Sequence, residues 1–373
     1  MKLRLLAVCA ALVFSAPAVA AAPEVSARAY RLENAATGEV LLRHADRARV
    51  PIASITKLMT VLVTLEHAKP GDVVAVSSGA SEVGESSVNL RPGERITVRD
   101  LLQAALIQSA NDAADALADY VGHGDRARFV AMMNSEARRL GLADTHFSRP
   151  DGLDAAGHLS SARDVTLLAE VAMHSPLVRS IVRRRTASIA GGRTLHTWND
   201  LLGRFPGLIG VKTGHTGAAG WCEVGAARGP RLTVYAAVLG SPSRSQRNAD
   251  LAALLRYGLS RYRVVQLVEP HKVYAHVRTE YGRKDVPLVA ETPVSRAVRV
   301  DRPLVQRVVA AGAVKLPVVA GDRLGLVRVV SGGRLVAESP LVAAKSVNRP
   351  GLAGRAGWYA KRTVHHLSGL FPL

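Results

Sequence analysis

Residues 51–60 read PIASITKLMT and place a serine hydroxyl, Ser54, three positions before a lysine amine, Lys57. The run Leu58–Leu65 that follows is mostly apolar and contains no Gly or Pro, so we expect a helix entered just after Pro51. Residues three apart lie on one face of a helix, and the lysine amine can therefore reach the serine hydroxyl. The stretch predicts a nucleophile paired with its own base.

Such a pair works only if the lysine can accept a proton. A serine hydroxyl becomes a good nucleophile when a neighbouring group takes its proton, and lysine does so only when its pKa is depressed. Desolvation, a second cation and a helix N-terminus each lower that pKa. About one Ser-x-x-Lys is expected by chance in a chain of this length, so the motif needs support from elsewhere in the sequence.

The first 22 residues have the composition of a secretory leader. Lys2 and Arg4 precede an apolar run, residues 5–14, and small residues dominate 16–22. A charged start, a short apolar core and small residues are typical of a signal peptide, which we expect to be cleaved near residue 20 or 22. The protein is therefore expected to work outside the cytoplasm.

The chain is strongly basic, with 49 Lys and Arg against 30 Asp and Glu and a formal charge of +19. Outside the cytoplasm the anionic partners are membrane phospholipid and the carboxylate-rich cell wall, and solubility is the alternative reason for the charge. Aromatic residues make up only 4% of the chain, which argues against stacking on nucleic-acid bases. Cleavage of the leader leaves Cys222 as the single cysteine, so no internal disulfide is expected.

Residues 23–262 show the elements of one domain. Two short strands joined by a turn are expected between Ala27 and Arg43, and a block rich in helices follows at 100–185, with Thr97 and Ser161 opening two of them. Strands are then expected at 186–189, 210–214, 221–227 and 232–239, before a closing helix at 245–257. Strands at both ends of a helical block predict one sheet built from distant parts of the chain.

A change of pattern marks a second domain at 263–345. Residues 273–278 alternate between apolar and polar, and short Val-rich runs recur at 286–289, 298–300, 305–309 and 314–319. Turn residues separate the last of the strands expected there. The pattern predicts a small all-β domain.

The end of the chain, 346–373, is expected to form a linker at 347–357 and then a helix. One face of that helix would carry Ala360, Val364, Leu367, Leu370 and Phe371, and the opposite face Arg355, Arg362 and His366. A basic amphipathic helix suits the surface of an anionic membrane, and this one is too short and too charged to span the bilayer. Packing of the helix on its own domain is the alternative.

Two further motifs support the serine–lysine pair. Ser109-Ala110-Asn111 and Lys212-Thr213-Gly214 follow Ser54-x-x-Lys57 in that order, with domain-sized gaps between them. This ordered triple is a recognised signature of penicillin-binding proteins and class A β-lactamases. The chain resembles the D-alanyl-D-alanine carboxypeptidases, low-molecular-mass penicillin-binding proteins of serine peptidase family S11. Further matching segments are Leu90-Arg91-Pro92-Gly93, Gly152-Leu153-Asp154 and His215-Thr216.

The resemblance implies an α/β fold, an antiparallel sheet flanked by helices as in β-lactamases and transpeptidases, followed by a small β-rich domain and a membrane-binding tail. It implies that Ser54 attacks the carbonyl between two D-alanines and that Lys57 is its base. Ser109 is expected to relay the proton to the leaving amine. Asn111 is expected to donate to a substrate carbonyl and to hold Lys57 in place.

The third motif is expected to bind the substrate. Lys212 and Thr213 are predicted to face its terminal carboxylate, and Lys212 to keep Lys57 neutral by like-charge repulsion. Gly214 allows close approach of the strand, and the resemblance implies that the N–H groups of Ser54 and His215 form an oxyanion hole. Arg193 and Arg244 are weaker candidates, better explained as solvated surface arginines. No cofactor or metal is expected, because the histidines are scattered.

The expected substrate is the peptidoglycan stem peptide, and β-lactams are expected to be covalent inhibitors. The protein is expected in the periplasm or cell envelope, on the outer face of the cytoplasmic membrane. A β-lactamase would need a dedicated glutamate, and residues 147–160 contain none. A transpeptidase or endopeptidase is poorly separated from a carboxypeptidase by sequence. A wall-binding module with a decayed site is disfavoured, because all the motif residues are present.

Overall fold

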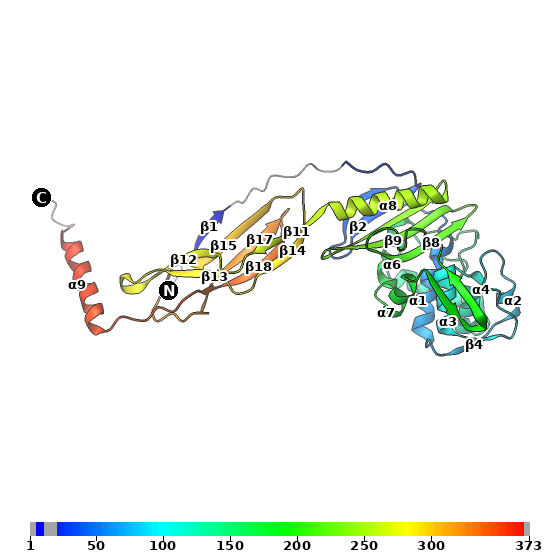
Figure 1. The fold of residues 1–373 in the computed structure, drawn as a ribbon, viewed down its shortest axis with the longest axis horizontal. Coiled ribbons are helices and arrows are strands. Elements are labelled where there is room, and N and C mark those ends of the chain that lie inside the picture. The colour runs from blue at the N-terminus through cyan, green and yellow to red at the C-terminus, as the bar shows by residue number, and fades with distance from the viewer. Residues whose placement is uncertain (1–4, 11–20, 369–373) are drawn as a thin grey trace. The chain divides into compact units, whose positions relative to one another are not determined.

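A computed structural model of the protein describes residues 5–10 and 21–368, which divide into two compact units. The first unit is Ala20–Ser260, and the second consists mainly of Arg261–Leu373. Our expected boundary lies between residues 262 and 263. The ribbon in Figure 1 shows the elements of each unit, and each is described separately below.

The first unit is built on a five-stranded antiparallel sheet. Its order is β3 (Glu39–His44), β2 (Ala29–Asn34), β10 (Leu232–Ser241), β9 (Gly220–Gly229) and β8 (Leu208–Thr216). Strand β2 pairs with β10 so that Leu32 lies opposite Ala236, about two hundred positions later. The expectation of one sheet assembled from both ends of the domain is confirmed.

Helices cover both faces of this sheet (Figure 1). On one face lies α8 (Arg244–Ser260), whose Leu251 packs so closely on β9 that a side chain at Gly225 would collide with it. The other face carries α6 (Ala162–Ala172) and the remaining helical block. The Thr97 and Ser161 side chains cap α3 and α6 as predicted, by accepting from the N–H groups of Asp100 and Asp164.

The other elements of the first unit surround these layers. The helices are α1 (Lys57–His67), α2 (Ser78–Ser81), α3 (Val98–Gln103), α4 (Asn111–Gly122), α5 (Arg126–Arg139) and α7 (Pro176–Val182), with a 3₁₀ turn η1 (Ala53–Thr56), a π-helical turn η2 (Ala104–Gln108) and a 3₁₀ turn η3 (Ala190–Gly192). The short strand pairs are β4 (Val73–Ala75) with β5 (Arg95–Thr97), and β6 (Thr186–Ile189) with β7 (Arg193–His196). One apolar core runs from α1 through α4 and α6 to the sheet.

The second unit is a β structure, as its alternating pattern predicts. Its main sheet has the order β1 (Leu5–Ala10), β15 (Leu304–Ala311), β17 (Arg323–Ser331), β18 (Arg334–Ala343), β13 (Val286–Ala290), β12 (Val273–Thr279) and β16 (Ala313–Val314), and β11 (Tyr262–Val268) pairs with β14 (Val294–Arg299). The expected strand at 314–319 is wrong, since β16 ends at Val314. Pro317 has no N–H to donate to a ladder, which opposes a longer strand.

The predicted leader falls largely outside the described residues, which include only 5–10 of its core. Those six residues form β1, which pairs antiparallel with β15. Removal of the leader remains a prediction.

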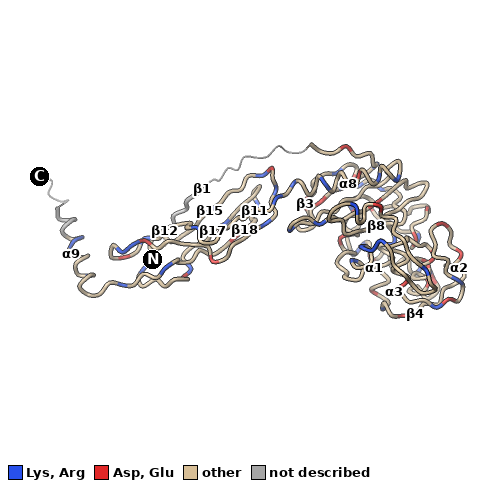
Figure 2. Tube along the Cα trace, viewed as in Figure 1, with Lys and Arg blue, Asp and Glu red and all other residues tan. Residues whose placement is uncertain are grey.

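The tail forms α9 (Leu352–Ser368), which begins inside the linker expected at 347–357. That boundary was wrong because the two glycines, Gly354 and Gly357, cost the helix only about 1 kcal/mol each, while Trp358 packs edge-to-face against Tyr281 with ring centroids 5.6 Å apart. After Glu338 the chain has five Lys or Arg and no Asp or Glu, and Figure 2 marks Lys and Arg positions of α9 in blue on the backbone trace.

Within the described residues, no single helix is long and apolar enough to cross a membrane. Taken together, α6 and α7 have the length and composition of a membrane span, but nothing more supports one. The two helices are bent by 110° at the break between them.

Candidate active site

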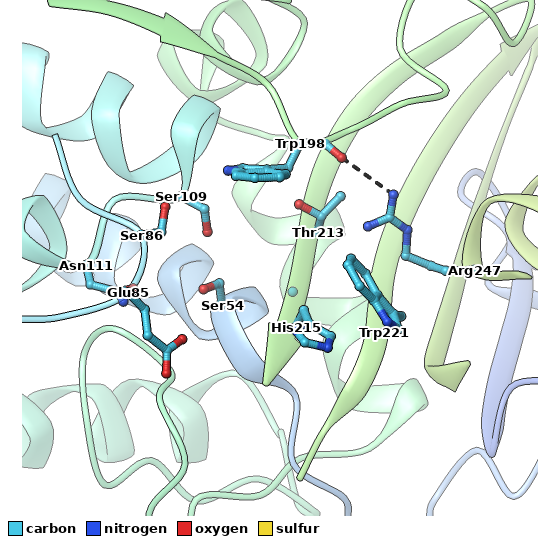
Figure 3. Close-up of a pocket in the computed structure, with 11 residues that line it drawn as sticks. Ser54, Glu85, Ser86, Ser109, Asn111, Trp198, Thr213, His215, Trp221 and Arg247 are labelled. Atoms are coloured by element: carbon cyan, nitrogen blue, oxygen red, sulfur yellow. Dashed lines mark hydrogen bonds between the residues drawn. The ribbon is translucent and has the colours of Figure 1, made fainter. Parts of the chain in front are cut away.

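Three distant segments meet at one pocket in the first unit: η1, the turn between η2 and α4, and strand β8. The pocket has a volume of about 210 Å³, and Figure 3 shows the side chains around it, with Ser54 near the centre. Its lining residues are Ser54, Glu85, Ser86, Ser109, Asn111, Trp198, Thr213, Gly214, His215, Trp221 and Arg247. The three sequence motifs, although separated by up to 158 positions from Ser54 to Lys212, therefore converge.

The backbone around Ser54 is held by close packing. Ser54 lies on the 3₁₀ turn η1, one turn before α1, and Lys57 is the first residue of α1. A Cβ at Gly152 would lie 2.2 Å from the Ala53 carbonyl oxygen, and a Cβ at Gly214 would lie 3.0 Å from the Ser54 nitrogen. Glycine is therefore required at both positions, so that the loop after Pro150 and the strand β8 can press against the serine turn.

Lys57 is fully buried, and its amine has three oxygen neighbours. Nζ lies 2.8 Å from Ser54 Oγ, 2.6 Å from Asn111 Oδ1 and 2.6 Å from the Asp151 carbonyl oxygen. The amide and carbonyl oxygens can only accept, whereas the serine hydroxyl can also donate. A neutral amine satisfies this geometry, because its two N–H groups donate to the acceptors and its lone pair faces the Ser54 hydroxyl.

Burial favours the neutral form of Lys57. Desolvation lowers the pKa of Lys57 to about 8, against the opposing effect of Asp151, Asp115 and other acidic groups. The pKa of Lys212 is lowered well below its usual value, again first by burial and then by Lys57. We expected repulsion from Lys212 to keep Lys57 neutral, but the cause that lowers the pKa of Lys57 is burial.

Ser109 is placed by an interruption of helical geometry. The helix that starts at Val98 widens into the π-helical turn η2, and Ser109 then takes a left-handed conformation with φ of 65°. Such π turns are frequent at functional sites. The turn directs Ser109 into the pocket, where its Oγ accepts a hydrogen bond of 2.8 Å from Lys212 Nζ.

Lys212 lies behind the pocket and does not line it. Its side chain is buried, and its amine donates to Ser109 Oγ and to the Thr213 carbonyl oxygen, each at 2.8 Å. Thr213 does line the pocket. That Lys212 faces a bound carboxylate stays a prediction; in this arrangement its amine contacts Ser109, the predicted proton relay.

The sequence did not indicate the arginine that lines the pocket. Arg247, on α8, is 1% exposed, and its Nε lies 3.0 Å from the Glu223 carboxylate. Its guanidinium also lies over the Trp221 ring, and Figure 3 shows its hydrogen bond to the Trp198 carbonyl oxygen. An arginine on a surface helix is usually predicted to be solvated. The burial of Arg247 at the pocket becomes evident only from the packing of α8 on β9.

The two arginines considered from sequence are paired elsewhere. Arg193 binds the Glu94 carboxylate at 2.6 Å and Arg244 binds Asp200 at 2.6 Å. Neither lines the pocket. The explanation as a solvated surface arginine is wrong for Arg193, whose side chain is only 17% exposed, whereas Arg244 is 39% exposed.

Asn111 joins the serine–lysine pair to the loop that precedes α3. Its Oδ1 accepts from Lys57, its Nδ2 donates to the Gly84 carbonyl oxygen at 2.9 Å, and its main-chain N–H donates to the Ser86 carbonyl oxygen at 2.7 Å. Asn111 therefore fixes Lys57 and the loop 84–86 together.

His215 and Trp221 complete the outer wall of the pocket. Their rings stack, with centroids 4.1 Å apart, and the His215 main chain follows Gly214, the residue against the Ser54 nitrogen. The described residues contain no group of three or more His, Cys, Asp or Glu that could hold a metal ion.

Comparisons with known proteins agree with the geometry. The sequence model of the family described as D-alanyl-D-alanine carboxypeptidase matches residues 16–243, and that of the penicillin-binding protein 5 C-terminal domain matches residues 262–349. D-alanyl-D-alanine carboxypeptidase DacD of Salmonella typhimurium is 32% identical to the chain, over 90% of each.

Two solved structures are similar to the chain over its first unit. The Streptomyces K15 DD-transpeptidase is 32% identical with a TM-score of 0.62, and the match covers 65% of this chain and 100% of that one. Penicillin-binding protein D2 of Listeria monocytogenes, solved in an ampicillin-bound form, is 32% identical with a TM-score of 0.58, over 63% of this chain and 98% of that one.

Proposed function

The chain belongs to the D-alanyl-D-alanine carboxypeptidase family, and on that premise we propose that it removes the terminal D-alanine from peptidoglycan stem peptides through a Ser54 acyl-enzyme. Membership confirms the resemblance first given by the three motifs. The observation that carries the proposal is the approach of the buried Lys57 amine to within 2.8 Å of Ser54 Oγ.

Acylation begins when Ser54 Oγ attacks the carbonyl between the two D-alanines and passes its proton to the Lys57 lone pair. The oxyanion that forms accepts from the N–H groups of Ser54 and His215. The amide C–N bond then breaks, and the leaving amine takes the proton that Lys57 received from Ser54, relayed through the Ser109 hydroxyl, which Lys212 holds at 2.8 Å. This transfer returns Lys57 to its neutral form. Water hydrolyses the ester, with Lys57 again as base, and restores Ser54.

Recognition of the substrate's free carboxylate is assigned to Thr213 and Arg247. A hydroxyl and a guanidinium are well suited to a carboxylate, and both residues line the pocket. Gly214 keeps β8 close to Ser54, and Asn111 donates its amide to a substrate carbonyl when it is not engaged with Gly84.

The test is release of D-alanine from a synthetic pentapeptide that ends in D-Ala-D-Ala. The purified mature protein is expected to release D-alanine, and Ser54→Ala is expected to release none. Absence of release by the wild type, or equal release by the two proteins, contradicts the proposal.

Transpeptidation is the second candidate, because the similar Streptomyces K15 protein is named a DD-transpeptidase. The same acyl-enzyme would then react with an amine instead of water. Adding glycine or another acceptor amine to the pentapeptide assay separates the two outcomes: hydrolysis yields the shortened peptide alone, and transpeptidation yields an acceptor adduct at the expense of hydrolysis.

We further propose an envelope location, with leader cleavage before residue 23 and attachment to the anionic outer face of the cytoplasmic membrane through α9. The support is the charge of the tail, since Arg355, Lys361 and Arg362 are its only charged residues besides histidines. Tyr359, an exposed aromatic side chain of α9, suits a membrane–water interface. Deleting residues 350–373 is expected to release active protein into the soluble fraction, and equal membrane recovery with and without them would refute attachment by the tail.

A further inference from the structure

The pocket has charges of opposite sign on its two sides. Among its described lining residues, Glu85 and Arg247 are the acidic and basic side chains besides the imidazole of His215. Figure 3 shows Ser54 between them, with Glu85 on the side of Asn111 and Arg247 on the side of Trp221. A ligand that spans Ser54 therefore meets a cation at one end and an anion at the other.

The backbone of Glu85 is fixed on both sides. The carbonyl oxygen of Gly84 accepts from Asn111 Nδ2 at 2.9 Å, and that of Ser86 accepts from the Asn111 main-chain N–H at 2.7 Å. The Ser86 hydroxyl also donates to the Gln108 carbonyl oxygen at 2.9 Å. The loop position is thus set by Asn111, the residue that also holds Lys57.

Glu85 itself adopts a left-handed conformation, with φ of 64°. This conformation is unfavourable for a residue with a β-carbon. The side chain is exposed, and within the described part of the chain its carboxylate has no hydrogen-bond or ion-pair partner. A carboxylate held at the edge of a pocket without a protein partner is free to bind a cation.

The direction of the substrate follows from the proposed function, on which this inference rests. When the terminal D-alanine carboxylate binds at Thr213 and Arg247 with the cleaved bond over Ser54, the peptide that precedes that bond must continue toward the other side. One residue spans about 3.5 Å of extended chain, so the residue before the D-Ala-D-Ala pair approaches Glu85.

We propose that Glu85 determines specificity at this position by binding a side-chain ammonium group on the residue that immediately precedes D-Ala-D-Ala. The preferred substrate class is a peptide with a free side-chain ammonium group on the residue before D-Ala-D-Ala. Acylation or cross-linking of that amine removes the charge, so the enzyme discriminates against stem peptides whose amine is already used.

The test compares two tripeptides that differ only in the side-chain charge: Nα-acetyl-L-Lys-D-Ala-D-Ala and its Nα,Nε-diacetyl form. The N-terminus is blocked in both peptides. The lysine ammonium of the first peptide is therefore the only cation, and the second peptide has none. D-Alanine release gives kcat/KM for each. The wild type is expected to favour the ammonium peptide about fivefold at low salt, the effect of one partly exposed ion pair, and the preference is expected to shrink as salt rises.

Glu85→Gln is expected to bring the ratio of kcat/KM for the two peptides close to one. Glu82→Gln, in the same loop but outside the pocket, is the matched control and is expected to keep the wild-type ratio. Glu85→Lys is expected to invert the preference, so that an Nε-succinyl-lysine peptide, which carries a carboxylate, is cleaved faster than the ammonium peptide.

The outcomes separate this inference from the proposed function. A wild type that releases no D-alanine from either tripeptide contradicts the carboxypeptidase activity itself. A wild type that cleaves both equally overturns the inference alone. If Glu85→Gln slows both peptides by the same factor, Glu85 acts on the loop or on the hydrolytic water, and the inference is also overturned.

Discussion

The two units of the protein differ in what they bury. The first unit buries the charged side chains Lys57, Lys212, Glu223 and Arg247 close to one pocket. Among the described residues of the second unit, Arg261 is the only charged side chain that is buried, and it is paired with Asp301. The rest of that core consists mainly of Val, Leu and Ala.

The difference in buried charge indicates which unit carries out catalysis. A buried charge costs several kcal/mol unless it is paired or neutralised, and the first unit places four of them together. Burial lowers the pKa of Lys57 to about 8 and raises that of Glu223 to about 7. The first unit also buries carboxylates that do not line the pocket, such as Asp164, and these are held by hydrogen bonds within the fold. What we attribute to catalysis is the concentration of buried cations at the pocket.

The largest effect is expected from removing the base. Lys57→Met keeps the bulk of the side chain but leaves Ser54 without a proton acceptor, and we expect acylation by a labelled penicillin to slow by about 10³-fold or more. Lys69→Met, at an exposed lysine near the end of α1, is the matched control and should react at the wild-type rate. Rapid acylation of a folded Lys57→Met protein would show that another group is the base.

A smaller loss is expected from moving the serine without changing its chemistry. In Gly214→Ala the new methyl group would lie 2.9 Å from the Ile52 carbonyl oxygen and 3.0 Å from the Ser54 nitrogen. A shift of the serine turn by a fraction of an ångström is expected to slow acylation by on the order of 10²-fold. Gly217→Ala meets no atom within 4 Å and provides the comparison; similar rates for the two variants would contradict the close packing.

The pH dependence of acylation reports the state of Lys57. Below a pH of about 8 the amine is increasingly protonated and has no lone pair, because its pKa is lowered to about 8 from the ordinary 10.5. The acylation rate is therefore expected to rise about tenfold per pH unit below that value and to level off above it. A profile that keeps rising to pH 10 would mean that the lysine retains its ordinary pKa.

The smallest effect on the reaction is expected from the second unit. Leu288→Ala and Leu58→Ala each remove a fully buried leucine side chain, one in each unit, and each should lower the free energy of unfolding of its own unit by about 2–5 kcal/mol. Only Leu58→Ala is expected to slow acylation, since Leu58 adjoins Lys57 on α1. Slower acylation in Leu288→Ala would mean that the units are coupled through the site.

Much of this arrangement could be predicted from local sequence. Hydrophobic periodicity and the caps at Thr97 and Ser161 gave the helices, and the three motifs gave Ser54, Lys57 and Ser109. Arg247 and Glu85 could not be predicted, because one reads as a solvated position on a helix and the other as part of a polar loop. Their roles come from tertiary packing, namely α8 on β9 and the bonds from Asn111 to the 84–86 loop.

The role of Lys212 shows the same limit. A lysine in a strand beside a substrate site suggests a direct contact with the ligand, and sequence does not reveal that its amine turns inward to Ser109 Oγ. The start of α9 depends on packing in the same way, since the edge-to-face contact of Trp358 with Tyr281 offsets the cost of two glycines in the helix.

The central claim is that Ser54, activated by a neutral Lys57, is the group that becomes acylated. The most direct measurement is mass spectrometry of peptides from the mature protein after reaction with a labelled penicillin at pH 9, above the pKa of Lys57. The account predicts one adduct, on Ser54, and none in Ser54→Ala. An adduct on Ser109 or another residue, or equal labelling of Ser54→Ala, would contradict it.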